Sequence, residues 1–378
     1  MLGALALGLA AAVYLVGEPR FRAEIFVWLP DGSVRRVSPD EGVYYQACIH
    51  PDGSSVIFAG GTGGPPRIFS VDLPSGEPRA LTPADSAAFL ASFAWDGERI
   101  VFSSDRDFEA ESVAMRDLVD PRLYRGGTRD PRMYLGEGDN YRHFSLYVMG
   151  ADGADARRIT TGEFRDLRGT FTPGGALITF ASTRDPYVHG EPYTPLWTVA
   201  SDGASEPVPF VFGGEDAWGA YRPWYTPTGR QLYFFGGKLE GLERAQALCV
   251  DVDAGSGVAG VPEPVPWDDR AKTQAPFVDP SGTSLLLHND RGGHSRLFEV
   301  PLDPETGRAV GDGQPLDPPG LPLPHDAEIM HPTRARNGAI AFDVSFRDGS
   351  WLVRKLQGLR ARIQALVGSG APSGRARL

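Results

Sequence analysis

Ionisable and aromatic side chains that could bind a ligand recur five to seven residues before a repeated turn in this 378-residue chain. The set is Tyr44, Tyr45, Gln46, Asp166, Arg168, Tyr221, Arg222, Gln274, His325 and Asp326, with Glu328 close by. Phenol rings, amides and charged groups brought toward one axis suit a peptide segment or a saccharide. We therefore predict that these residues form a ligand-binding site. The alternative is that they are ordinary loop residues around a water-filled channel.

Three carboxylates of this set, Asp166, Asp326 and Glu328, could serve an enzyme, with His325 as a candidate base. Cleavage of a saccharide needs a carboxylate pair, or a metal with a base, within hydrogen-bond reach. A binding protein needs only a complementary surface. A serine peptidase is nearly excluded because no Gly-x-Ser-x-Gly elbow occurs in the chain. We assign no catalytic residue.

Seven histidines raise the question of a metal site. His50 and His331 each precede the proline of a predicted turn in neighbouring repeats, and His288 and His294 flank Asp290. Imidazole binds zinc, manganese or iron, but no tight ligand spacing such as His-Glu-x-x-His appears. We predict no metal and no other cofactor.

A turn of the Pro-Asp-Gly type precedes a short apolar run six times along the chain. The predicted turns span residues 50–53, 94–97, 172–175, 226–229, 279–282 and 331–334. The apolar runs, such as Val56-Ile57-Phe58, are typical of strands, and a later hairpin turn such as Asp152-Gly153 recurs in most units. A period of about 40–55 residues with four short strands per unit predicts a β-propeller.

The two ends of the repeat region complete one another. Residues 25–38 resemble the second half of a unit, and residues 329–342 resemble a first half. Five whole units and this composite give six blades, and closing the ring removes exposed sheet edges. We predict an all-β fold, a six-bladed β-propeller closed by strands from both termini.

The repeat resembles the TolB-like propeller family, which has a WD40-like Pro-Asp-Gly repeat, over about residues 24–345. The matching segments are Ser103-Ser104-Asp105-Arg106, Ser182-Thr183-Arg184-Asp185 and Ser145–Gly153. Trp95 replaces the turn proline in one copy, and Thr333-Arg334 replaces Asp-Gly in another. The resemblance implies a propeller of the cell envelope, whereas activity varies widely among propellers. Oligogalacturonate lyases are also propellers, so an enzyme is the alternative to a binding protein.

The net charge of −11 disfavours nucleic acid as a partner, since phosphate binding needs clustered Lys and Arg. Cys48 and Cys249 each lie in an apolar segment, which predicts two buried free thiols.

The domain boundaries follow from hydropathy and repeat length. Residues 1–17 carry no charge, which predicts a signal peptide or membrane anchor. Residues 24–350 are the predicted propeller. Leucines at helical spacing between basic residues predict an amphipathic helix over 351–367, which packs on the closing blade or binds a membrane or partner. Residues 368–378 form a predicted disordered tail.

Residues 107–142 lengthen one hairpin beyond the repeat. Long loops in compact folds are usually functional or disordered, and the corresponding hairpin of the next unit, residues 186–193, should lie beside this insertion. We predict a lid or a partner-docking surface built from both.

These features together predict a non-catalytic propeller, exported to the periplasm or anchored in the cell envelope, that binds a protein or peptide partner. Membrane association would go through residues 1–17. The alternative is a carbohydrate-active lyase or hydrolase with its site in the propeller channel.

Overall fold

The computed structural model describes residues 20–108, 143–184, 195–214, 218–238, 246–253, 259–266, 273–290, 293–321, 323–324 and 327–348. Every regular element in these ranges is a β-strand, and none of the described residues forms a helix that could span a membrane. Ala23–Ser345 form one compact unit. The predicted segments 1–17, 351–367 and 368–378 lie outside the described residues, as does the insertion after Phe108.

Four separate sheets of four antiparallel strands make up most of this unit. The first contains β7 (Ala88–Phe93), β8 (Arg99–Ser104), β9 (Ser145–Gly150) and β10 (Arg157–Arg158). The second contains β11 (Asp166–Phe171), β12 (Leu177–Ser182), β13 (Leu196–Ala200) and β14 (Val208–Pro209). The third contains β15 (Trp218–Tyr225), β16 (Gln231–Lys238), β17 (Gln246–Asp251) and β18 (Glu263–Pro264). The fourth contains β19 (Thr273–Val278), β20 (Ser284–Asn289), β21 (Arg296–Pro301) and β22 (Gln314–Pro315).

The remaining strands form one eight-stranded sheet that joins the two ends of the repeat region. It contains β1 (Arg20–Trp28), β2 (Val34–Arg36), β3 (Val43–Ile49), β4 (Ser55–Gly61), β5 (Arg67–Asp72), β6 (Arg79–Ala80), β23 (Glu328–Arg334) and β24 (Ile340–Asp348). The order is β23-β24-β1-β3-β4-β5-β6, with β2 paired to β1.

The prediction of an all-β, propeller-like fold is confirmed, but the prediction of six separate blades is not. The described residues contain four separate four-stranded blades, and the other two predicted blades are fused into the eight-stranded sheet. The physical cause is the length of β1, whose Ala23 pairs in parallel with Val43 of β3. This pairing satisfies backbone groups that would otherwise lie at two facing edges.

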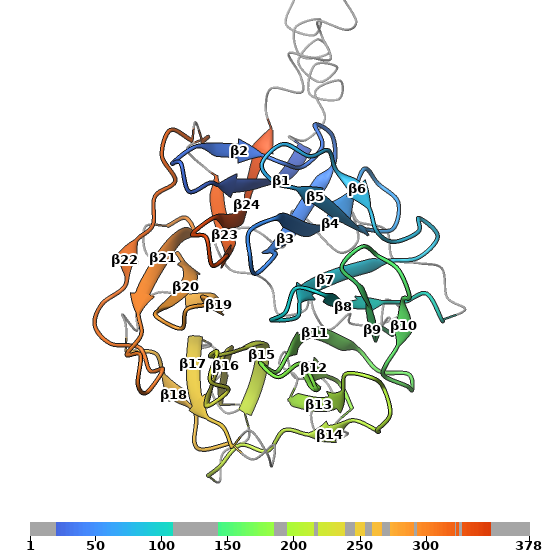
Figure 1. Ribbon diagram of the computed structural model, residues 1–378, viewed down its shortest axis with the longest axis vertical. Helices are drawn as coiled ribbons and strands as arrows, with labels where there is room; N and C mark the ends of the chain where they lie inside the picture. Colours follow the sequence, from blue (N-terminus) through green and yellow to red (C-terminus); the bar gives the residue numbers. More distant parts are fainter. Residues whose placement is uncertain are drawn as a thin grey trace, which may run out of the picture. The chain divides into compact units, whose positions relative to one another are not determined.

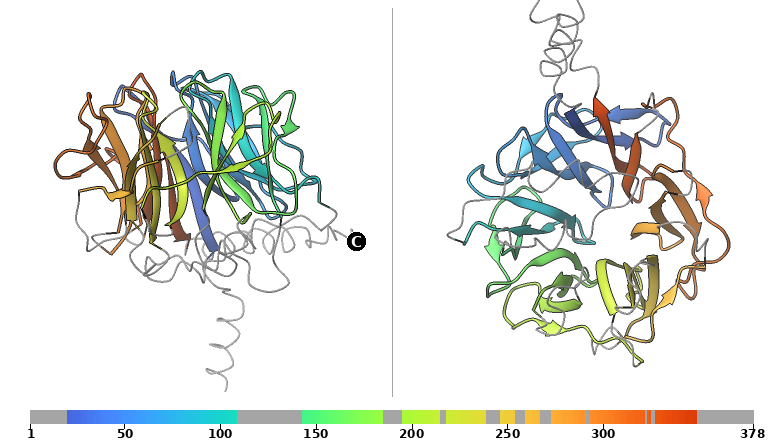
Figure 2. Two further views of the ribbon diagram at one scale, coloured as in Figure 1. Left: turned by 90° about the horizontal axis from the view of Figure 1, so that it is seen from below. Right: turned by 180° about the vertical axis from the view of Figure 1, so that it is seen from behind.

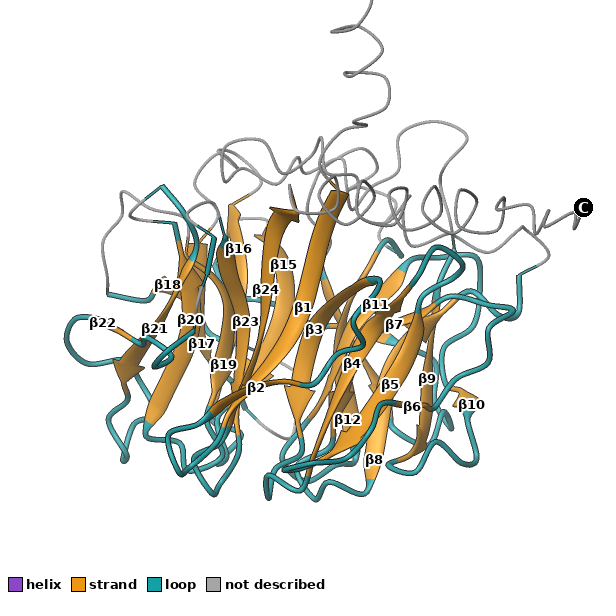
Figure 3. Cartoon of the chain, turned by 90° about the horizontal axis from the view of Figure 1, so that it is seen from above, coloured by secondary structure: helices purple, strands orange, loops and turns teal. Residues whose placement is uncertain are grey.

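The innermost strand of each repeat faces a common axis (Figure 1). These strands are β3, β7, β11, β15, β19 and β23; each contacts the next, and β23 contacts β3. Figure 2 gives the same arrangement from below and from behind, and Figure 3 shows the strands running side by side from one end of the unit to the other.

Apolar side chains fill the spaces between neighbouring sheets. Ile57 of β4, Phe93 of β7 and Phe102 of β8 belong to one buried cluster, and Val101 of β8 and Phe180 of β12 belong to the next. Because each sheet is covered on both faces, its second strand is apolar at successive positions, not only at alternate ones. The apolar runs of the sequence are therefore the second strands of the repeats.

The turn between the first and second strands closes on a glycine with positive φ in all six copies. These glycines are Gly53, Gly97, Gly175, Gly229, Gly282 and Gly338. In the last copy the turn is Ala335–Gly338, where the Gly338 N–H donates to the Ala335 carbonyl. The predicted turn at 331–334 is wrong, since those residues lie inside β23. Pro332 has the sequence context of the turn proline, but it lies in a strand.

Candidate functional site

Each innermost strand carries a bulge at the same place. In β3, Tyr45 pairs with Ala59 and Cys48 with Ile57, so two residues oppose one. The first bulge residue has φ between 52° and 58° in every copy, and these residues are Gln46, Leu90, Arg168, Arg222, Ala275 and His331. The left-handed conformation costs a residue with a Cβ about 1–2 kcal/mol. Bulges bend a strand and re-aim its side chains, and six such bulges in one ring identify the place to look for function.

The six bulges surround a cavity of about 90 Å³. Every innermost strand contributes three successive residues to its lining, namely 46–48, 90–92, 168–170, 222–224, 275–277 and 331–333. The cavity is smaller than the roughly 150 Å³ that hold one benzene molecule in an engineered protein cavity. It therefore suits a small polar group, such as one side-chain head group, better than a whole sugar ring.

The second residue of the bulge is unpaired in the ladder, which explains its composition. This position is occupied by Ala47, Ala91, Gly169, Pro223, Pro276 and Pro332. Proline has no N–H and is tolerated in a sheet only where no ladder hydrogen bond is required. The three prolines thus fit the bulge and also stiffen the cavity wall.

A buried polar network occupies one side of the cavity. Nη2 of Arg222 lies 2.6 Å from Nε2 of His331, and Nδ1 of His331 lies 2.7 Å from Oδ1 of Asp343. Arginine only donates hydrogen bonds, so Nε2 accepts and Nδ1 carries the proton that is donated to Asp343. Asp343 also accepts the N–H of Gln46 at 3.1 Å. His331 is therefore held as a neutral imidazole with both ring nitrogens engaged.

His288 supports this network from the neighbouring sheet. The backbone N–H of His331 donates to Nδ1 of His288 at 3.2 Å, and the two rings meet edge to face at 5.2 Å. His288 and His331 are both buried. The left-handed backbone at His331 is thus fixed by a side chain of β20.

Arg168 enters the cavity from β11 and has a different environment. Its guanidinium lies 4.8 Å from the centroid of the Tyr221 ring, and the residue is only 9% exposed. Nε and Nη2 of Arg168 have no hydrogen-bond partner among the residues that the structure describes. A cation–π contact contributes about 0.5–2 kcal/mol, which is less than the several kcal/mol that burial of a charge costs.

The cavity is cationic although the protein is acidic. Arg168 and Arg222 line it, and no Asp or Glu is among the lining residues, whereas the chain as a whole has a net charge of −11. Burial raises the pKa of the lining thiol Cys48 to about 12, so it adds no negative charge at neutral pH. Low-dielectric walls strengthen the field of such like charges.

An apolar layer borders the bulges at the end where the innermost strands begin. Phe89, Leu167, Tyr45 and Tyr221 occupy the position just before the bulge in four neighbouring strands and pack in one cluster. Phe89 meets Phe144 edge to face at 4.9 Å. These four residues, three of which are aromatic, form a layer just before the bulge residues that line the cavity, and we refer to it as the aromatic layer.

The structure brings together some of the predicted ligand residues and separates others. Gln46, Arg168 and Arg222 line the cavity, and Tyr45 and Tyr221 lie in the apolar layer. Tyr44 is buried between sheets, where its hydroxyl donates to the Glu41 carbonyl. Gln274 precedes the bulge, which is occupied by Ala275. A binding role for these residues stays a prediction.

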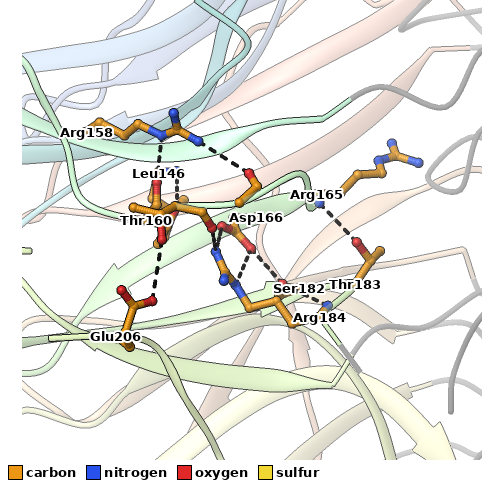
Figure 4. A network of polar contacts seen from close by, with 11 residues as sticks. Leu146, Arg158, Thr160, Arg165, Asp166, Ser182, Thr183, Arg184 and Glu206 are labelled. Atoms are coloured by element: carbon orange, nitrogen blue, oxygen red, sulfur yellow. Dashed lines mark hydrogen bonds and ion pairs between the residues drawn. The ribbon is translucent and has the colours of Figure 1, made fainter. Parts of the chain in front are cut away.

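Asp166 takes part in a structural ion pair (Figure 4). Its carboxylate accepts from Nη2 of Arg184 at 2.6 Å and from Oγ of Ser182 at 2.6 Å. Nη2 of Arg184 also donates to the Thr161 carbonyl, and the guanidinium stacks on Phe164 at 4.5 Å. The Asp166 carboxylate thus ties two strands of its own sheet to the preceding connection, and it is absent from the cavity lining.

The wrong prediction of the sixth turn explains why the last three predicted ligand residues are not found in the cavity lining. His325 and Asp326 lie outside the described residues, and Glu328 begins β23 without lining the cavity. His331 takes the equivalent position, and sequence reasoning missed it as a channel residue. The available signal was the Asn337-Gly338 pair, which marks a hairpin turn and lies seven residues after His331, the spacing of Gln46 to Gly53.

The histidines proposed as equivalent occupy different positions. His50 contacts Asp52 through Nδ1 at 2.5 Å and the Gly97 carbonyl through Nε2 at 3.2 Å, at a turn, whereas His331 lies in a strand. Among the described residues no group of three His, Cys, Asp or Glu side chains is arranged to hold a metal. Cys48 and Cys249 are buried free thiols, as predicted.

Known proteins resemble this chain mainly in fold. No protein-family model matches the chain. A curated TolB homolog from Chlorobium chlorochromatii is 28% identical over 147 residues, which are 35% of this chain and 32% of the relative. The solved structure of a TolB from Agrobacterium tumefaciens superposes with a TM-score of 0.54 at 16% identity, covering 86% of this chain and 99% of its own. The chain is therefore similar to TolB in its β-propeller fold.

The chain matches its relatives over a small part of its sequence and over most of its fold. The match spans about a third of the curated relatives, including 25% identity over 145 residues of the TolB homolog from Chlorobium luteolum. TolB from Acinetobacter baumannii superposes with a TM-score of 0.50 at 13% identity over 86% of this chain and 70% of its own. The two superpositions show the propeller fold, and the ligand must be argued from the site.

Proposed function

We propose that this chain is a non-catalytic TolB-like propeller that binds a protein or peptide partner in the cell envelope. The observation that carries the proposal is the cavity to which all six innermost strands contribute, bordered by an aromatic layer. Aromatic and arginine side chains dominate the energetics of protein–protein recognition. A peptide segment offers apolar and polar side chains in sequence, which suits two successive layers of this kind.

The eight-stranded sheet acts as two blades in this proposal. One is β3-β4-β5-β6 and the other is β23-β24-β1-β2, and in the described part of the chain the pair of Ala23 and Val43 joins them. The six-fold repetition of the bulge and of the cavity lining supports this count. Strands from both ends of the repeat then close a six-bladed ring.

The partner is proposed to approach from the end where the innermost strands begin. The loops 107–142 and 186–193 follow β8 and β12, whose last residues Ser104 and Ser182 pair with the first residues of β7 and β11. Ser104 and Ser182, which precede these two segments in the sequence, thus lie at the end that carries the aromatic layer. This placement supports the prediction that the two loops add to the docking surface.

The location in the envelope, and membrane association through residues 1–17, are part of the same proposal. Likeness to TolB homologs and the uncharged N-terminal segment support them. The carbohydrate-active alternative has less support among the described residues. The Asp166 carboxylate is engaged by Arg184, and both nitrogens of His331 are engaged by Arg222 and Asp343.

Partner capture with a variant of the aromatic layer tests the proposal. We expect Tyr45→Ser to weaken capture of the envelope partner by about tenfold, since loss of an aromatic anchor typically costs 1 kcal/mol or more. The control is Ser75→Ala at an exposed outer loop, which should leave capture unchanged. The measurement is quantitative pull-down by the tagged full chain from an envelope fraction, with the thermal midpoint of each variant recorded. Equal capture by both variants would remove the proposal.

A further inference from the structure

One edge of the guanidinium of Arg168, which lines the cavity, has no protein acceptor. Nε and Nη2 are the two atoms without a hydrogen-bond partner among the described residues. Their N–H groups point in parallel from one side of the planar guanidinium, which is the fork that accepts both oxygens of a carboxylate. The side chain is more than nine-tenths buried, so solvent does not replace such an acceptor freely.

The surroundings of this edge favour a carboxylate over other anions. The Tyr221 ring supports one face of the guanidinium, and the lining contains apolar carbons of Leu90, Ala91 and Ala275. These carbons would contact the alkyl part of an organic acid, whereas a fully ionised phosphate would have to be desolvated against them. A carboxymethyl group is small enough for the volume of about 90 Å³.

Gln46 offers a second, independent group. Its Oε1 is buried without a hydrogen-bond partner among the described residues, and it lines the same cavity from β3. Arg168 thus lacks acceptors while Gln46 lacks a donor. A carboxylate that carries a neighbouring N–H or O–H group would satisfy both.

We propose that the cavity at the six bulges is a carboxylate-binding site in which the Nε–Nη2 edge of Arg168 takes both oxygens. The carboxylate comes either from a free small acid or from an acidic residue of a bound peptide. The second case rests on the function proposed above, and the first does not.

The test compares acetate with acetamide, which has the same shape and no charge, as probes of the full-length chain. A ligand that binds only the native state raises the thermal midpoint in a concentration-dependent way. We expect acetate to stabilise the protein and acetamide to have no comparable effect at the same ionic strength. Capped Gly-Asp-Gly and Gly-Asn-Gly peptides form the second pair and distinguish a peptide carboxylate from a free acid.

Arg168→Gln should weaken acetate binding by about tenfold or more, because it removes a charge-assisted bidentate pair. The matched control, Arg230→Gln, removes the same charge from an exposed turn and should bind acetate like the wild type. If Arg168→Gln does not fold, the comparison of acetate with acetamide on the wild-type protein still tests whether the cavity binds a carboxylate. Equal effects of the two probes in each pair, or unchanged binding by a folded Arg168→Gln, would overturn the proposal. If acetate does not stabilise the protein more than acetamide does but partner capture is intact, the carboxylate site is refuted and the proposed partner binding is not.

Discussion

At the scale of single residues, the cavity depends on side-chain size as well as on charge. Ala275 lies on β19, between β15 with Arg222 and β23 with His331 in the order of the innermost strands. Its methyl group leaves room for the Arg222 guanidinium to reach His331 at 2.6 Å. A longer side chain at this bulge would compete with that hydrogen bond.

The bulge strain itself can be measured at Ala275. Ala275→Gly should raise the free energy of unfolding by about 1 kcal/mol, because glycine adopts positive φ without the Cβ penalty. The control is Ala91→Gly at the second bulge position of β7, which lacks positive φ and should lose about 0.5–1 kcal/mol. Urea unfolding of both variants gives the comparison. A loss of stability in both would mean that the bulges are not strained.

At the scale of elements, ion pairs connect one sheet to the next. Arg334 of β23 contacts both carboxylate oxygens of Glu299 on β21, at 2.5 and 3.0 Å. Ser284 of β20 donates to the same carboxylate. The Arg334 hydrogen bond is the main cause of the lowered pKa of Glu299. The pair links the fourth separate blade to the closing strands.

This pair gives stability with a defined pH dependence. A lowered pKa means that the stabilisation is present above the unfolded pKa of about 4.3 and is lost as the pH falls through the folded pKa. Arg334→Gln should therefore lower the free energy of unfolding by about 1 kcal/mol at pH 7. The difference from the wild type should shrink as the pH falls below the unfolded pKa and disappear once the pH is below the folded pKa. Urea unfolding at several pH values tests this, and a difference independent of pH would contradict it.

The elements differ in how far the sequence predicts them. The turns require glycine and the second strands require apolar residues, so the sequence alone predicts where these elements repeat. The bulge residues Gln46, Leu90, Arg168, Arg222, Ala275 and His331 share no side-chain property, because the backbone conformation is imposed by register and not by residue type. Pro332 shifted the last repeat because proline suits both a turn and a bulge. The position of His331 therefore required the structure.

At the scale of the whole molecule, stability depends on joining the two ends of the repeat region. Ile25 of β1 is fully buried in a cluster with Val56 of β4 and Ala339 and Ala341 near or in β24. One cluster thus contains residues from both ends of the chain's propeller. The parallel pair of Ala23 and Val43 adds a backbone connection at the same place.

Ile25→Ala tests this closure. We expect it to lower the free energy of unfolding by about 2–4 kcal/mol, the usual cost of removing a fully buried isoleucine side chain. Val34→Ala in β2, which is only partly buried, should cost much less and serves as the control. If the two substitutions cost the same in chemical denaturation, β1 is not part of the closing core.

We propose that the partner docks at the end of the propeller where the aromatic layer precedes the cationic cavity. Photocrosslinking tests it most directly, with a benzoylphenylalanine probe replacing Tyr45 in the aromatic layer or Ser75 on the outer loop of the full-length chain. We predict a crosslink to the envelope partner from position 45 and none from position 75. A crosslink from position 75 without one from position 45 would contradict the account and move the binding surface to the outside of the ring.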